Sequence, residues 1–146
     1  MKFLDVKPYP TGMQISRNHK LLDFVYDERA YDNRFYMQYV NQPAIVENIR
    51  FLCDTLIDPL EYRMGMTFEI ISGYRCRGVD LLAGEPDTQL HIQGLAIDIR
   101  PFVGIYDLID QIYHLPFHEC YVFDQYIHIG VKPQFNQGRF IDFRKK

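Results

Sequence analysis

Residues 43–58 carry the clearest periodic pattern of apolar and polar positions in the chain. Pro43 suits the first turn of a helix there, and Pro59 is expected to end it because proline interrupts helical hydrogen bonds. Cys53 lies on the apolar stripe, so we expect its thiol to be buried and unreactive. The apolar residues recur at the spacing of an amphipathic helix: Ile45, Val46, Ile49, Leu52, Cys53 and Leu56.

Residues 105–113 repeat this helical pattern and predict a second helix. A third helix is expected to begin at Ser16, which suits an N-cap, and to run to Val25. The aromatic-rich residues 31–39 do not favour one element over another. Their rings are expected to pack or to lie at the surface, and an aromatic shelf for a glycan or a peptide is the alternative.

Alternation of apolar and polar residues predicts two strands, in residues 95–99 and 126–131. Asp98 faces away from the apolar side of the first strand, and His128 faces away from the apolar side of the second. Two adjacent strands would therefore present Asp98 and His128 from the same side of a sheet.

Shorter strands are expected in residues 67–71 and 120–123. A tight hairpin at residues 124–125 would join the second of these to the strand that carries His128. Residues 76–90 contain glycine and proline breakers, and we expect them to form a long loop that delivers His91.

Composition indicates one globular domain of 146 residues, 47% of them hydrophobic. The formal charge of −3 argues against a nucleic-acid partner, because no basic stripe is available to neutralise phosphates. Three scattered cysteines do not make a disulfide framework and fit a reducing compartment. No signal peptide or membrane span is recognisable, so we expect a protein that is cytoplasmic as synthesised and has no membrane partner.

Asp98 lies between bulky apolar neighbours, and a shielded carboxylate needs a compensating partner. With His91 and His128, the chain offers two imidazoles and one carboxylate, the donor set of a catalytic zinc site with its fourth position open to water. The alternative is a satisfied polar cluster, in which Asp98 binds backbone groups or an arginine. Because imidazole binds metal in its neutral form, zinc affinity is expected to fall below about pH 6.

The remaining histidines, His19, His114 and His118, have no comparable context and are expected at the surface or at helix ends. Gly94, between His91 and the strand, would permit a close approach of the chain that a side chain would hinder.

Three pieces of the sequence form a set: Ser72-Gly73-Tyr74-Arg75, His91-x-x-Gly94-x-Ala96-x-Asp98 and the strand histidine His128. Together they resemble the zinc D-alanyl-D-alanine carboxypeptidases and their relatives of hedgehog-like fold. Residues 41–43, 48–52 and 58–60 resemble the preceding helix and its exit in the small phage-associated and bacterial branch of that family. The resemblance spans roughly residues 14–131.

The resemblance implies an α+β fold, in which a small antiparallel sheet carries the zinc site and helices pack on one side of it. Residues 1–13 would form an N-terminal arm, and residues 14–146 a single metallopeptidase-like domain. Zinc, as Zn2+, would be the cofactor, held by His91, Asp98 and His128.

The resemblance also implies roles for residues around the metal. Arg75 would face the substrate cleft and bind a peptide carboxylate or a developing oxyanion, and an ion pair with a nearby carboxylate is the alternative. Ser72 and Tyr74 would shape the turn. Tyr126 shares a strand face with His128 and would bind substrate through its hydroxyl, with a packed tyrosine as the alternative.

The sequence departs from the family pattern at the general base. The family has an acid either three residues before the last histidine or farther back across a hairpin. This sequence has Gln125 and Phe123 at those positions. Asp124 is the nearest carboxylate and the expected base, and Glu119 is the next candidate. Gln89 is a second departure, because the family commonly has serine two residues before the first histidine.

The function implied is a zinc-dependent peptidase, a monomer that hydrolyses peptide bonds of peptidoglycan next to a D-amino acid. The alternative is a catalytically inactive, zinc-binding relative that acts as a phage structural or cell-wall-binding module. A phage-encoded protein, released by lysis or carried in a virion, would reach the wall without a signal peptide.

Overall fold

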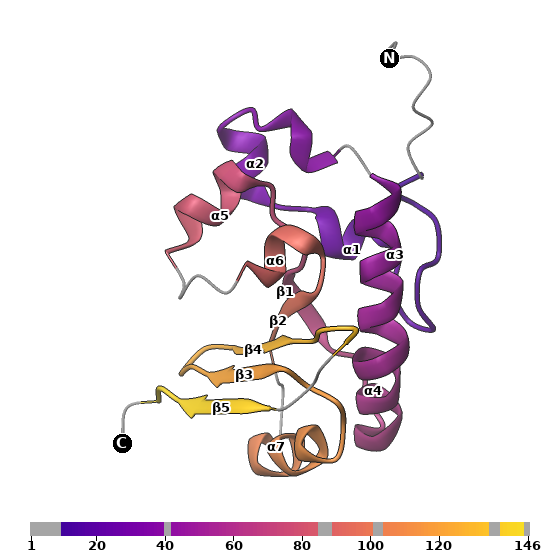
Figure 1. Cartoon of the computed structure of the whole chain (residues 1–146), viewed down its shortest axis with the longest axis vertical. Helices are drawn as coiled ribbons and strands as arrows, with labels where there is room; N and C mark the ends of the chain where they lie inside the picture. The colour runs from indigo at the N-terminus through magenta and orange to yellow at the C-terminus, as the bar shows by residue number, and fades with distance from the viewer. Residues whose placement is uncertain (1–9, 40–41, 85–88, 101–103, 135–137, 145–146) are drawn as a thin grey trace.

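The computed structural model describes residues 10–39, 42–84, 89–100, 104–134 and 138–144. The fold is α+β, with one five-stranded mixed sheet in the order β1-β2-β4-β3-β5 (Figure 1). The strands are β1 (Glu69–Ser72), β2 (Ala96–Arg100), β3 (Glu119–Val122), β4 (Ile127–Gly130) and β5 (Arg139–Asp142).

The antiparallel sheet expected from the sequence is confirmed for four strands, and β5 adds a parallel pairing with β3. The strand β5 was not predicted. It occupies the sheet edge beside β3, and its residues are mostly half-buried, so its apolar alternation is too short and weak to stand out in the sequence.

Register places the polar residues of neighbouring strands side by side. Asp98 on β2 pairs with His128 on β4, and His128 pairs with Tyr121 on β3. Directly opposed residues of antiparallel strands point to the same face. Ser72 at the end of β1 pairs with Asp98 after an irregularity in the β1–β2 register, so it joins the same face.

The opposite face of the sheet contributes to one continuous apolar core. Ile97, Ile127 and Ile129 are almost fully buried there. The helix α7 (Ile105–Tyr113), which the sequence predicted, adds Leu108 and Ile112 to this core and contacts α4 (Asp58–Met64).

The helix α3 (Pro43–Leu52) begins at Pro43 as predicted, and Cys53 is buried in the core. The expected end at Pro59 is wrong. A π-helical segment, η3 (Cys53–Ile57), leads directly into α4, which has Pro59 in its first turn. Proline is tolerated there because its missing N–H is one that a first turn leaves unbonded. The three segments form the long column on one side of Figure 1.

The N-terminal part contains α1 (Leu21–Val25), α2 (Glu28–Asp32) and the 3₁₀ helix η2 (Tyr36–Tyr39). The expected helix start at Ser16 is wrong, because a short bridge between Gln14 and Lys20 precedes α1. Of the expected arm, residues 1–9 lie outside the described residues.

The expected loop after Arg75 is also largely helical. It contains α5 (Arg77–Ala83), which packs beside α2, and the short helix α6 (Leu90–Gln93), which carries His91 (Figure 1). Glycines stand at the ends of both helices, Gly84 and Gly94 in left-handed conformation. The breakers thus mark helix ends rather than a continuous loop. No helix in the described ranges is long and apolar enough to cross a bilayer.

Candidate metal centre

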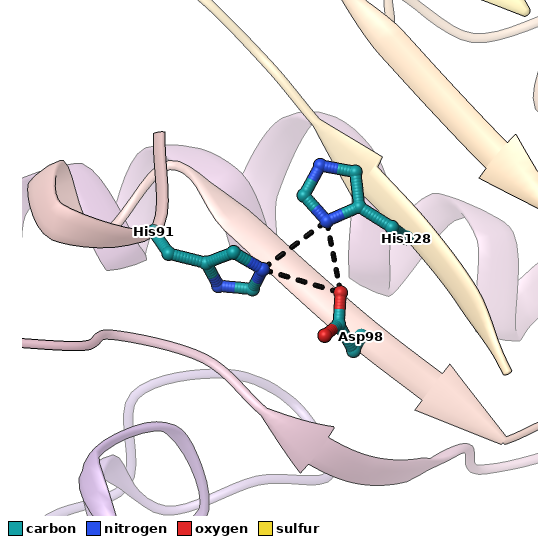
Figure 2. A group of neighbouring side chains, drawn as sticks. All are labelled: His91, Asp98 and His128. Atoms are coloured by element: carbon teal, nitrogen blue, oxygen red, sulfur yellow. Dashed lines mark hydrogen bonds and ion pairs between the residues drawn. The ribbon is translucent and has the colours of Figure 1, made fainter. Parts of the chain in front are cut away.

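His91, Asp98 and His128 converge from α6, β2 and β4 (Figure 2). His91 Nε2 lies 3.2 Å from Asp98 Oδ1 and 3.1 Å from His128 Nδ1. His128 Nδ1 lies 2.9 Å from Asp98 Oδ1. All three residues are buried, so their mutual contact is not a chance meeting of solvated side chains.

The second nitrogen of each histidine has a partner that only accepts hydrogen bonds. His91 Nδ1–H donates to the carbonyl oxygen of Gly73 at 2.6 Å, and His128 Nε2–H donates to the carboxylate of Glu119 at 2.5 Å. These partners fix the tautomers, so that lone pairs of His91 Nε2 and His128 Nδ1 face the centre.

Glycines provide the room for these contacts. A Cβ at Gly130 would lie 2.9 Å from Glu119 Cγ and 2.6 Å from Leu90 Cδ1. A Cβ at Gly94 would lie 3.0 Å from the carbonyl oxygen of Ile45, which agrees with the close approach expected there.

When both imidazoles are neutral and the carboxylate is ionised, the three atoms that face one another are all electron-pair donors. None of them then carries a hydrogen that could bridge it to another. Such an arrangement needs a cation, either a proton or a metal ion. In tetrahedral zinc sites with bonds of about 2.0–2.1 Å, the ligand atoms lie about 3.3 Å apart. The separations here are close to that value, so the residues fit a metal ion of this type.

The electrostatics of the centre agree with a cation between the donors. Burial alone would raise the pKa of Asp98, but His91 and His128 outweigh it and hold that pKa well below the usual 3.8. Burial alone would lower the pKa of His128, but the hydrogen bonds with Asp98 and Glu119 raise it from 6.5 to about 9. At neutral pH, a proton on His128 therefore takes the place that a metal would fill.

Arg75 is engaged by the metal centre itself. One of its terminal nitrogens donates to Asp98 Oδ2 at 2.8 Å, and its Nε donates to Ser72 Oγ at 2.9 Å. A further ion pair joins it to Asp80 at 3.6 Å, and only 2% of the side chain is exposed. The structure therefore confirms the ion pair with a nearby carboxylate, and a direct role in substrate binding stays a prediction.

A cavity of about 450 Å³ opens beside the centre. Arg75, Asp98, Ser72 and Tyr126 lie in its wall, and the substrate-binding role expected for Tyr126 stays a prediction. The wall also contains a segment that no motif indicated, the connection from α1 to α2 together with the first residues of α2: Tyr26, Asp27, Glu28 and Arg29.

The expected bases lie in different surroundings. Glu119 is buried and bound to His128, so it is placed to orient a ligand. Asp124 lies exposed in the turn between β3 and β4, where Phe123 N–H donates to the carbonyl of Tyr126 at 2.9 Å and closes the predicted hairpin.

Aromatic rings cover this side of the sheet. Phe123 stacks between Tyr126 and Phe143, with ring centroids 4.7 and 5.1 Å away. Tyr121 stacks on the ring of His128 at 5.3 Å. The sequence could have predicted that Tyr121 lies against His128. A strand in residues 119–123 that is joined by a two-residue hairpin at 124–125 to the next strand pairs Tyr121 with His128.

The other histidines lie outside the centre. His114 follows α7 and is exposed, as expected. Of the two positions expected for His19, the surface is wrong and the helix end is right: it directly precedes the N-cap of α1, is buried, and its Nε2 lies 2.7 Å from the carboxylate of Glu61. Glu61, which lies in α4, also accepts from the backbone N–H of Phe68, so the pair links the segment before α1 to the residue that precedes β1.

A scan against models of known protein families finds no match to this chain, and a search of curated proteins finds none either.

Proposed function

We propose that this protein is a zinc-dependent peptidase that hydrolyses peptide bonds of peptidoglycan next to a D-amino acid. The observation that carries the proposal is the convergence of two buried imidazole nitrogens and one carboxylate oxygen, with Asp98 also lying in the wall of an open cleft. Three protein ligands leave a fourth position for water, which is the arrangement of catalytic zinc. The motif resemblance to D-alanyl-D-alanine carboxypeptidases supports the hedgehog-like fold and the substrate class.

In this proposal, bound zinc lowers the pKa of a water molecule towards ~7 and so supplies a nucleophile at neutral pH. His91, Asp98 and His128 hold the ion. Gly73 and Glu119 keep the two imidazoles in the tautomers that bind it. Arg75 keeps Asp98 oriented by binding its second oxygen.

Asp124 is the general base that we propose, because Glu119 is committed to His128. A positioned base contributes on the order of 10²- to 10⁴-fold to rate. The competing function is a zinc-binding module without catalysis. The observation that favours it is the pair of residues at the family's acid positions, since Phe123 is packed in an aromatic stack and Gln125 has no acid group.

The test is to incubate the purified protein, with and without zinc, with whole peptidoglycan and to identify released fragments by mass. We expect zinc-dependent release, and we expect Asp124→Asn to keep the metal and to lose activity by about 10²- to 10⁴-fold. Asp110→Asn, at an exposed position of α7, is the matched control and should change nothing.

An inactive wild-type protein that holds zinc firmly would favour the binding module over the peptidase. Activity that survives Asp124→Asn would remove Asp124 from the mechanism.

A further inference from the structure

Two guanidinium groups and three carboxylates lie in the wall of the cleft beside the metal centre. The guanidinium groups belong to Arg29 and Arg75, and the carboxylates to Asp27, Glu28 and Asp98. The pairing among these five groups decides which charge on a substrate the cleft can accept.

Both cations are already neutralised. Arg75 binds Asp98 at 2.8 Å, lies 3.6 Å from Asp80 and is almost completely buried. Arg29 binds both carboxylate oxygens of Asp27, with Nε and one terminal nitrogen at 3.0 and 2.8 Å. A free C-terminal carboxylate of a substrate would therefore have to displace an existing ion pair.

Glu28 is the carboxylate of the cleft wall that takes part in none of these ion pairs. It is exposed in the first turn of α2, and it forms no hydrogen bond or ion pair with any residue in the described ranges. Its charge therefore faces the cleft without a protein counter-ion.

We infer that Glu28 binds a primary ammonium group on the peptide that occupies the cleft. This inference rests on the proposed peptidase function and narrows its substrate class. The cleft selects a peptide with a lysine-like side chain, and it does not select a terminal carboxylate. Because removal of a terminal residue would require binding of its free carboxylate, this charge pattern favours hydrolysis of an internal peptide bond.

Binding of two stem peptides to the metal-free protein tests the inference without requiring catalysis. One peptide carries lysine, the other norleucine in its place, and both have an acetylated N-terminus and a terminal D-alanine amide. We expect the lysine peptide to bind about two- to fivefold more tightly at low ionic strength, the range of a partly exposed ion pair. About 0.5 M salt should reduce this preference.

Glu28→Gln should abolish the preference while retaining binding of the norleucine peptide. Glu47→Gln is the matched control, because Glu47 is an exposed residue of α3 outside the cleft wall, and it should keep the preference. A version of the norleucine peptide with a free C-terminal carboxylate should bind no more tightly than its amide.

Equal affinity for the lysine and norleucine peptides in the wild type, or a preference that persists in Glu28→Gln, would overturn the inference. Failure of the peptidase proposal would give a different result: the peptides would bind the zinc-loaded protein and would not be cleaved.

Discussion

The nitrogen that His128 presents to the centre depends on one buried residue, Glu119. Its carboxylate accepts the Nε2–H of His128 at 2.5 Å and so leaves Nδ1 for the metal. We expect Glu119→Ala to weaken zinc binding by about 10- to 100-fold, the usual cost of losing such a partner. Glu119→Gln keeps an oxygen that can accept the same hydrogen and should lose less affinity. Competition with a chelator measures both, and unchanged affinity in both variants would show that Glu119 does not orient His128.

The raised pKa of His128 predicts an unusual pH dependence of zinc binding. In the metal-free protein this pKa is about 9, so a proton occupies His128 at neutral pH. Zinc must displace that proton, and its affinity should therefore rise about tenfold per pH unit up to about pH 9. Proton release on zinc addition, followed by calorimetry in buffers of different ionisation enthalpy, checks this. A plateau of affinity above about pH 6 would contradict it.

As pH rises, the stability of the metal-free protein should fall, whereas its affinity for zinc should rise. The folded-state pKa of His128 is raised above its ordinary value of 6.5. Its contribution to the free energy of unfolding is therefore fully present below about pH 6.5 and is lost as pH rises through about 9. The sequence placed the zinc transition near pH 6 because nothing local to His128 indicates that Glu119 lies against it.

At the scale of elements, the turn after β1 fixes the position of α6. The carbonyl of Gly73 accepts from His91, and the next N–H, of Tyr74, donates to the carbonyl of Phe24 in α1 at 2.8 Å. A Cβ at Gly73 would lie 2.6 Å from that oxygen and 2.9 Å from Phe24 Cα, both of them backbone atoms. The turn therefore has room for glycine alone.

We expect Gly73→Ala to lower the free energy of unfolding by about 1–3 kcal/mol and to weaken zinc binding, because backbone atoms must move apart. Denaturant unfolding of the metal-free protein measures the first effect. Gly12→Ala is the control, since no atom lies within 4 Å of its added Cβ. Equal stability of both variants would mean that the turn and α1 separate without cost.

The sequence predicted well those elements that bury one face, because burial of one face makes apolar residues recur at regular spacing. Alternation around Asp98 and His128 predicted β2 and β4, and the stripe in residues 105–113 predicted α7. Proline and glycine were less informative. Pro59 lies inside a continuous column because a π-helical segment precedes it, and Gly84 ends a helix within an expected loop.

At the scale of the whole molecule, the candidate site joins segments that no local pattern connects. The cleft wall from Tyr26 to Arg29 lies far in sequence from Asp98, and the buried pair His19–Glu61 joins the segment before α1 to α4. Such contacts depend on how α1 and α4 pack against the sheet. The three ligands could be predicted because their motif lies in two strands and the residues just before one of them.

Zinc should stabilise the molecule as a whole, because its ligands come from α6, β2 and β4. A ligand that binds only the folded state adds about 4 kcal/mol when present at about 1,000 times its Kd. We therefore expect zinc to raise the Tm of the wild type and a chelator to lower it, as followed by circular dichroism. In His128→Ala the two conditions should give the same Tm; a shift as large as that of the wild type would place the zinc elsewhere.

The central claim is that His91, Asp98 and His128 together hold one zinc ion, and metal analysis of the purified protein tests it most directly. We predict one equivalent of zinc per chain in the wild type and in the control His114→Ala, whose imidazole is exposed at the end of α7. His91→Ala and His128→Ala should each lose the metal. A full equivalent of zinc in both of these variants would contradict the account.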